Sequence, residues 1–124
     1  MKSIYIVEDN ENNRMLFEDI FRKHLHLYSL RFFSDGLQLL EVLKQEHPDI
    51  ILLDMRLPHL SGWDIAKTIK HNPILEKIPI IAVTAHAMKG DETRALEAGC
   101  SEFVTKPIKK QILLDNVGAL LANS

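Results

Sequence analysis

Cysteine and long apolar runs are both scarce in this sequence of 124 residues. Its one cysteine, Cys100, excludes an intramolecular disulfide and a cysteine-rich zinc site. No apolar run approaches the roughly 20 residues that a membrane-spanning helix needs. The N-terminal residues turn acidic at Glu8, which is too early for a secretory signal peptide. We therefore expect a cytoplasmic protein that is not bound to a membrane.

Neither sign of charge dominates the sequence. The 15 Lys and Arg residues nearly balance the 17 Asp and Glu residues, so no overall attraction to nucleic acid is expected. No helix-turn-helix segment or basic face remains for DNA binding. A glycine-rich loop and a Walker lysine are also missing after the first apolar run, which argues against nucleotide binding. The remaining composition, 46% hydrophobic and 26% charged, is typical of one globular domain, which we place over residues 1–124.

Short apolar runs alternate with longer segments of helical periodicity along the sequence. The runs show little polar alternation, as expected for strands buried on both faces: Ile4–Val7, Leu30–Phe33, Ile50–Leu53, Ile80–Val83 and Phe103–Val104. The helical segments are Asn12–His24, Gly36–Glu46, Ser61–His71, Lys89–Ala98 and a last one that contains Leu113–Leu121. Of these, Lys89–Ala98 has the weakest apolar face. Five strands alternating with five helices predict an α/β fold, with a doubly wound parallel sheet covered by helices on both faces.

Polar side chains follow four of the five predicted strands. In chain order they are Glu8 and Asp9, then Asp54, then Thr84, and finally Lys106. In an open α/β sheet, ligands bind at the carboxyl ends of the strands. We therefore expect these three carboxylates, the hydroxyl and the ammonium group to converge at one edge of the sheet.

Each of these residues alone has an ordinary structural explanation. An acid after a strand commonly caps the next helix or belongs to a turn. Three carboxylates at one edge, however, repel one another unless a cation or a proton intervenes. Hard oxygen ligands favour Mg²⁺, which is held by few carboxylates and keeps water molecules that a phosphate can replace. The combined pattern therefore indicates a site for Mg²⁺ and a phosphoryl group.

Several motifs resemble the CheY-like receiver domain of bacterial two-component response regulators, and the resemblance covers essentially the whole chain. The motifs are Ile6–Asn10 (IVEDN), Leu52–Pro58 (LLDMRLP), Ser61–Gly62, Ala82–Ala85 (AVTA) and Lys106–Ile108 (KPI). The stretch VTAHAMKGDE, from Val83 to Glu92, is similar both to receivers of hybrid histidine kinases and to stand-alone DivK-type regulators. The resemblance implies a (βα)5 flavodoxin-like fold with strand order 2-1-3-4-5.

The resemblance also implies a role for each residue at the strand ends. Asp54 matches the aspartate that accepts the phosphoryl group. Thr84 and Lys106 match the hydroxyl and the ammonium group that pair with phosphoryl oxygens, and the Lys106–Pro107 peptide bond is expected to be cis. Phe103 matches the aromatic residue of the family's switch. The implied Mg²⁺ ligands are Glu8, Asp9, Asp54 and the backbone carbonyl of Arg56.

The function that the resemblance implies is that of a stand-alone response regulator in a two-component phosphorelay. A sensor histidine kinase or a histidine phosphotransfer protein would donate the phosphoryl group. An output protein would bind the face made by the fourth helix, fifth strand and fifth helix. Arg56 and His86 are expected to flank the phosphoryl group and to set its lifetime.

Such a protein is a switch rather than a turnover enzyme. The alternative is a small Mg²⁺-dependent phosphatase that also forms an aspartyl phosphate. Haloacid-dehalogenase-like enzymes of that kind have a second acid two residues after the nucleophile, and this sequence has Arg56 there. A lasting stoichiometric adduct would distinguish the switch from the phosphatase.

Overall fold

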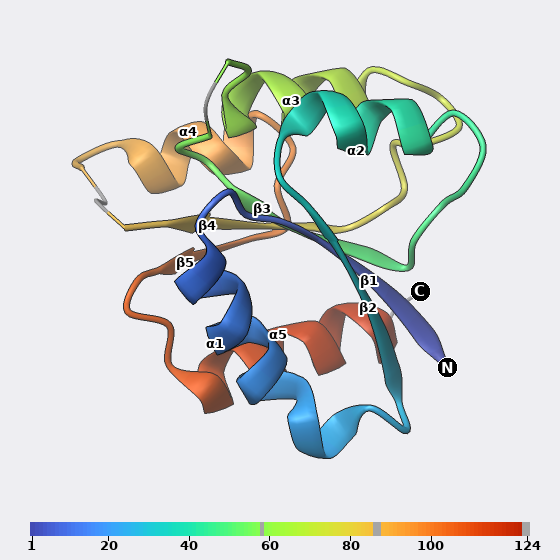
Figure 1. Cartoon of the computed structure of the whole chain (residues 1–124). Coiled ribbons are helices and arrows are strands. Elements are labelled where there is room, and N and C mark those ends of the chain that lie inside the picture. Colours follow the sequence, from blue (N-terminus) through green and yellow to red (C-terminus); the bar gives the residue numbers. More distant parts are fainter. Residues whose placement is uncertain (58, 86–87, 123–124) are drawn as a thin grey trace.

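The computed structural model describes residues 1–57, 59–85 and 88–122, and a parallel sheet runs through the middle of this part of the chain (Figure 1). Its strands are β1 (Lys2–Val7), β2 (Tyr28–Phe33), β3 (Ile50–Asp54), β4 (Ile80–Thr84) and β5 (Glu102–Thr105). They lie in the order β2-β1-β3-β4-β5, and every neighbouring pair is parallel. The predicted α/β fold and the strand order implied by the resemblance are both confirmed.

Helices cover both faces of the sheet, as the alternation of elements predicted. They are α1 (Glu11–Phe21), α2 (Gly36–Val42), α3 (Gly62–Lys70), α4 (Asp91–Glu97) and α5 (Lys110–Ala122), with a short 3-10 turn over Arg22–His24. Helices α2, α3 and α4 lie on one face, and α1 and α5 lie on the other (Figure 1). Within the described residues, no helix is long and apolar enough to cross a bilayer.

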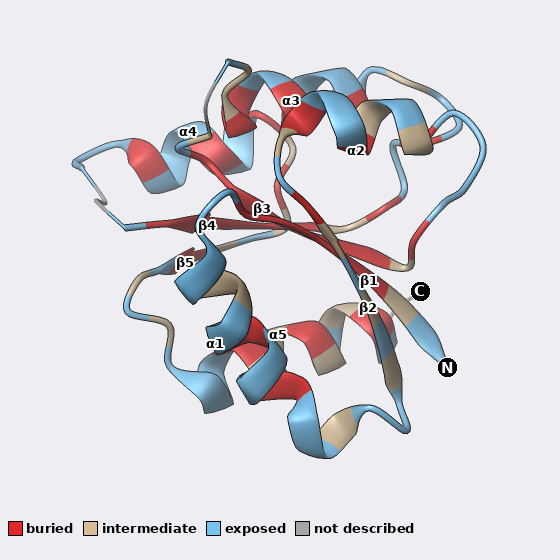
Figure 2. Cartoon of the chain, in the orientation of Figure 1, coloured by how far each residue is buried: buried red, intermediate tan, exposed pale blue. Residues whose placement is uncertain are grey.

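The two faces of the sheet form two separate hydrophobic cores. Successive residues of β1 alternate between them: Tyr5 and Val7 join the core beneath α2 and α3, while Ile4 and Ile6 join the core beneath α1 and α5. Every residue of β3 and β4 is buried, as Figure 2 shows for the middle of the sheet. Burying one Val, Leu or Ile side chain contributes roughly 1.5–3 kcal/mol. The central strands are therefore firmly held, and so are the polar residues at their ends.

The structure differs from the sequence-based predictions at the edges of the sheet and on two helices. Strand β2 begins at Tyr28, two residues earlier than expected, and its residues alternate between partly buried and exposed positions up to Phe33, which is buried. Burial on both faces was therefore wrong for this strand, because an edge strand reaches beyond the helices that cover the centre. The helical spacing of the segments Asn12–His24 and Lys89–Ala98 predicts Leu16 and Leu96 on apolar helix faces, and both are exposed.

Helix α4 has little apolar packing, in agreement with its weak apolar pattern. Its buried residues are Asp91 and Ala95. It starts after Gly90, which has a left-handed backbone (φ 92°) that favours glycine and provides no side-chain cap. The guanidinium carbon of Arg94 lies 4.4 Å from the ring centre of Trp63, which attaches α4 to α3 by a cation–π contact. A helix held mainly by polar contacts is well suited to shift its position.

Cys100 is buried in the core beneath α2, α3 and α4. Burial raises the pKa of its thiol to about 11, although the nearby charge of Lys70 acts in the opposite direction. The thiol therefore stays protonated at neutral pH. Cys100 is therefore a small core residue rather than a reactive group.

Candidate functional site

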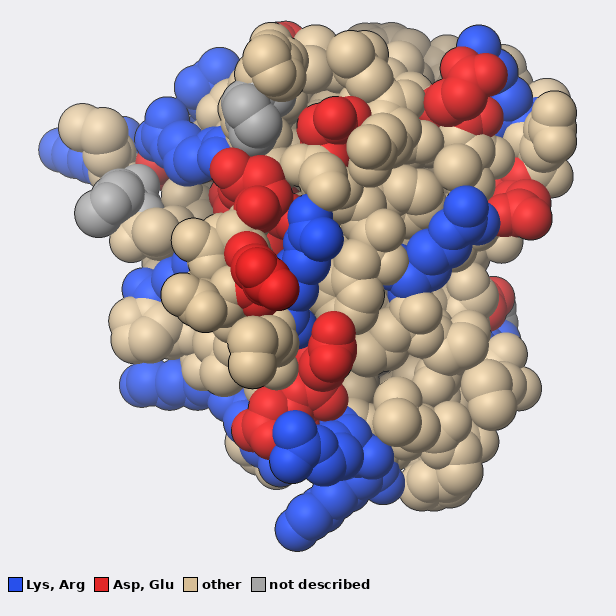
Figure 3. Space-filling view, in the orientation of Figure 1, with Lys and Arg blue, Asp and Glu red and all other residues tan. Residues whose placement is uncertain are grey.

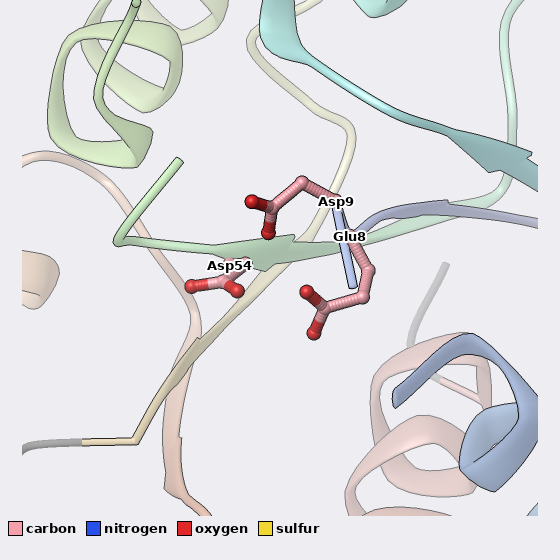
Figure 4. Close-up of side chains that lie close together, drawn as sticks. All are labelled: Glu8, Asp9 and Asp54. Atoms are coloured by element: carbon pink, nitrogen blue, oxygen red, sulfur yellow. The ribbon is translucent and has the colours of Figure 1, made fainter. Parts of the chain in front are cut away.

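Glu8, Asp9 and Asp54 lie together at the carboxyl ends of β1 and β3 (Figure 4). These strands are neighbours, and Val7 is paired with Leu53, so the residues that follow each pair also meet. One carboxylate oxygen from each residue lies within 4.8 Å of the other two. Figure 3 shows several acidic side chains in a band down the middle of the visible face, with Lys and Arg side chains beside them. The expected convergence of the three carboxylates is thus present.

Helix capping does not explain these three acids. The side chain of Asn10 caps α1 by accepting from the Asn13 N–H, and Ser61 caps α3 by accepting from the Asp64 N–H. Glu8 and Asp54 are nonetheless almost fully buried, with exposed fractions of 1% and 6%. Burying carboxylates is costly unless they are paired. Their position therefore points to a partner that compensates their charge.

Lys106 supplies part of that compensation. Its Nζ lies 2.7 Å from Oε1 of Glu8 and 3.2 Å from Oδ2 of Asp54. Burial by itself would lower the pKa of Lys106, but the hydrogen bond to Glu8 and the charges of Asp54 and Glu8 outweigh it, so the pKa is raised. Lys106 thus stays charged throughout the physiological range. The Lys106–Pro107 peptide bond is cis, as the resemblance implied.

Backbone N–H groups donate to the second carboxylate oxygen of both buried acids, the oxygen that does not contact Lys106. The N–H of Arg56 donates to Oδ1 of Asp54 at 2.8 Å, and the N–H of Asn10 donates to Oε2 of Glu8 at 3.2 Å. The Arg56 side chain turns away and forms an ion pair with Asp91. His86, the other residue expected beside the phosphoryl group, lies outside the described residues.

Thr84 ends β4, next to β3, where Val83 is paired with Asp54. Its side chain is fully buried, and its Oγ1 has no hydrogen-bond partner within the described residues. An unpaired buried hydroxyl costs free energy, so binding of a ligand that accepts a hydrogen bond from it would be favoured. Phe103 lies on the neighbouring strand β5, is partly buried, and packs against the core beneath α4.

We expect Thr84→Val to leave the free energy of unfolding unchanged or to raise it by about 1 kcal/mol. The substitution keeps the branched shape and removes a buried hydroxyl that makes no hydrogen bond. Urea unfolding monitored by circular dichroism measures the change. Thr68→Val is the matched control, because the Thr68 hydroxyl donates to the Asp64 carbonyl at 2.9 Å and its loss should not stabilise. A clear loss of stability in Thr84→Val would show that its hydroxyl is hydrogen-bonded in solution.

Two residues of the site region were missed by the sequence analysis. Arg14 donates from Nε to the Glu8 carbonyl at 2.8 Å and from Nη2 to Oγ of Ser34 at 2.6 Å, which fastens the loop that carries Glu8 and Asp9. Its spacing of four residues from the Asn10 cap, one helical turn, was a signal that could have found it. Asp91 is the other, and it looked like an ordinary acid in the first turn of a helix.

The donor set fits a hard divalent cation. Three carboxylates face one another, and a single ammonium group contacts two of them. Negative charge therefore remains in excess, and Asp9 is exposed at the open side of the cluster. Oxygen ligands of this kind suit Mg²⁺ better than softer metals.

Comparison with known proteins agrees with this geometry. Residues 4–118 match the response regulator receiver domain. The chain belongs to this family. This chain is 40% identical over 123 residues to the polar-differentiation response regulator DivK from Brucella ovis, and the match covers 99% of this chain and 98% of DivK.

Solved receiver domains have the same fold. One belongs to a signal transduction histidine kinase from Syntrophus aciditrophicus, with a TM-score of 0.89 and 29% identity, covering 99% of this chain and 92% of the other. Another is the receiver domain of the sensor histidine kinase PA1611 from Pseudomonas aeruginosa, with a TM-score of 0.87 and 31% identity over 98% of each chain. That structure contains a magnesium ion in its active-site cleft. The family supports a two-component signalling switch over the phosphatase alternative.

Proposed function

We propose that Asp54 accepts a phosphoryl group from a histidine of a sensor kinase or phosphotransfer protein, in a reaction that requires Mg²⁺. The observation that carries the proposal is the buried Asp54 carboxylate, held by Lys106 and the Arg56 N–H and facing Glu8 and Asp9. A nucleophile, a fixed cation and an open acidic pair are what transfer to a carboxylate requires.

In the proposed reaction, an oxygen of Asp54 forms a bond to phosphorus while the bond from phosphorus to the donor histidine nitrogen breaks. The imidazole leaves with that electron pair. Lys106 already contacts Asp54, so its ammonium group can pair with a phosphoryl oxygen as the charge moves. Glu8, Asp9, Asp54 and the Arg56 carbonyl would hold Mg²⁺, which when bound supplies positive charge to the phosphoryl oxygens.

Incubation of the chain with Mg²⁺ and acetyl phosphate tests this proposal. We expect intact mass to show one phosphoryl group per chain. When EDTA is added before the phosphodonor, no phosphoryl group should be incorporated. Continuous release of phosphate without a lasting adduct would instead support the phosphatase alternative. The absence of both products would contradict the proposed function.

Asp9→Asn is expected to abolish Mg²⁺ binding and to stabilise the metal-free fold. Asp9 is exposed and, in the described part of the chain, forms no ion pair, so its charge only repels Glu8 and Asp54. Calorimetric Mg²⁺ titration and urea unfolding in EDTA measure the two effects. Glu11→Gln removes the same charge two residues further along, in the exposed first turn of α1, and is the control. A destabilised Asp9→Asn protein would assign Asp9 a structural role.

We further propose that phosphorylation changes the surface formed by α4, β5 and α5, where an output protein binds. The unpaired hydroxyl of Thr84 can donate to a phosphoryl oxygen, and Phe103 on the next strand can repack into the space left behind. A surface cleft of about 250 Å³ already opens there, lined by Phe103, Val104, Thr105, Pro107, Lys109 and Ile112. Coupling of roughly 1–3 kcal/mol between phosphorylation and binding is the usual range.

Two expectations from the sequence stay predictions. One is that the chain acts as a single stand-alone domain over residues 1–124, and the other is that it works in the cytoplasm.

A further inference from the structure

Arg56 connects the proposed phosphoryl site to the start of α4. Its backbone N–H donates to Oδ1 of Asp54 at 2.8 Å, and its guanidinium Nη2 lies 3.2 Å from Oδ2 of Asp91, the first residue of α4. A residue that contacts the Asp54 carboxylate is therefore tied by charge to a helix that starts 35 residues further along the chain.

The two partners of this ion pair differ in how much they depend on it. The Asp91 side chain is only 11% exposed, whereas that of Arg56 is 46% exposed. Oδ2 of Asp91 also accepts from the Met88 N–H at 3.0 Å, but Arg56 is the only cation that pairs with it among the described residues. A buried carboxylate loses much of its compensation without its cation, while a half-exposed guanidinium can move into solvent or to another anion.

A second contact attaches α4 to the same part of the chain. Arg94 lies three residues after Asp91 and stacks on Trp63, at the start of α3. The preceding Gly62 donates its N–H to the Met55 carbonyl, immediately after Asp54. A Cβ on Gly62 would lie 2.6 Å from the Met55 Cα, so this segment is closely packed. Both polar attachments of α4 thus lead back to the residues that follow Asp54.

We propose that Asp91 is a positioning residue that holds the Arg56 guanidinium away from Asp54, and that a phosphoryl group on Asp54 competes with Asp91 for it. The inference rests on the proposed function of Asp54. A phosphoryl group carries up to two negative charges and offers several oxygens to a planar guanidinium. The Arg56 side chain starts beside Asp54, so exchange requires rotation of that side chain alone. Exchange removes the charge partner of Asp91 and releases the first turn of α4.

A double-mutant cycle with beryllofluoride, a phosphoryl mimic, tests the competition in the presence of Mg²⁺. The four proteins are the unchanged chain, Asp91→Asn, Arg56→Ala and the double variant. Asparagine keeps an acceptor for the Met88 N–H and removes the charge that holds Arg56. We expect Asp91→Asn to tighten beryllofluoride binding roughly fivefold when Arg56 is present, and to have no effect in the Arg56→Ala background.

Glu92→Gln is the matched control for this cycle. It removes the same charge from the next residue of α4, which is exposed, and no contact joins it to Arg56 within the described residues. Equal effects of Asp91→Asn and Glu92→Gln would reduce the result to net charge and overturn the inference. Equal effects of Asp91→Asn with and without Arg56 would overturn it as well. Failure of the unchanged chain to bind beryllofluoride would overturn the proposed function together with this inference.

Amide hydrogen exchange of α4 gives a second readout. In the unchanged chain, beryllofluoride is expected to speed exchange in the first turn of α4 by breaking the ion pair. Arg56→Gln should exchange rapidly there without beryllofluoride and show no further increase when it binds. This variant breaks the pair from its exposed side, so it also tests the idea if Asp91→Asn folds poorly. Unchanged exchange in α4 on beryllofluoride binding would contradict the release of the helix.

Discussion

A chain carrying Asp54→Asn is expected to incorporate no phosphoryl group under conditions in which the unchanged chain forms a stoichiometric adduct. The amide keeps the shape of the side chain and can still accept from the Arg56 N–H, but it lacks the anionic oxygen that attacks phosphorus. Asp54 is the last residue of β3, is buried, contacts Lys106 and faces the consecutive acid pair Glu8 and Asp9, which come from another strand. Intact mass after incubation with Mg²⁺ and acetyl phosphate measures the incorporation.

Asp115→Asn is the control for this substitution, because Asp115 is exposed on α5 and does not belong to the described acid cluster. It should be labelled as fully as the unchanged chain. Circular dichroism would verify that Asp54→Asn is folded. Labelling of folded Asp54→Asn at the rate of the unchanged chain would move the acceptor to another side chain, with Asp9 as the nearest candidate.

The positions of the site residues could be predicted because they follow from the chain order of the strands. Parallel strands of one sheet end at the same edge, so Asp54, Glu8 and Thr84 had to meet once their runs were read as neighbouring strands. The register of Val7 with Leu53 then sets Glu8 beside Asp54. No knowledge of side-chain packing is needed for this step.

Side-chain partners across the loops could not be predicted in the same way. The pairing of Arg56 with Asp91 depends on how the loops after β3 and β4 turn, and these loops have no periodic pattern. The same holds for Arg14, which reaches both Glu8 and Ser34. Leu16 and Leu96 were misplaced because helical periodicity identifies a stripe but not its width, and both lie at its margin.

The structure also shows how charge is balanced in the site. From the sequence, we expected three acids that repel one another unless a cation or a proton intervenes, with the Lys106 ammonium group at the same edge, but not which acids it pairs with. In the structure, Lys106 pairs with the two buried acids, and Asp9 is left at the exposed side. In the fold without metal, one ammonium group therefore pairs with both buried acids, and we expect its loss to lower stability more than the loss of any single acid.

Lys106→Met is accordingly expected to lower the free energy of unfolding in EDTA by about 3–5 kcal/mol, the range for breaking a buried ion pair from one side. Methionine keeps much of the apolar stem, so the loss reports the charge rather than the packing. Glu8, with a 1% exposed side chain, would be left without its cation. The double variant Lys106→Met/Glu8→Gln should recover most of the loss, because it removes the buried charge that the single variant leaves unpaired.

Lys44→Met, at an exposed ion pair with Glu41, is the control and should change the free energy of unfolding little. If Lys106→Met matches this control in urea unfolding, or if Glu8→Gln fails to rescue it, Lys106 does not hold the acidic cluster together, and its contact with Asp54 serves phosphoryl transfer alone.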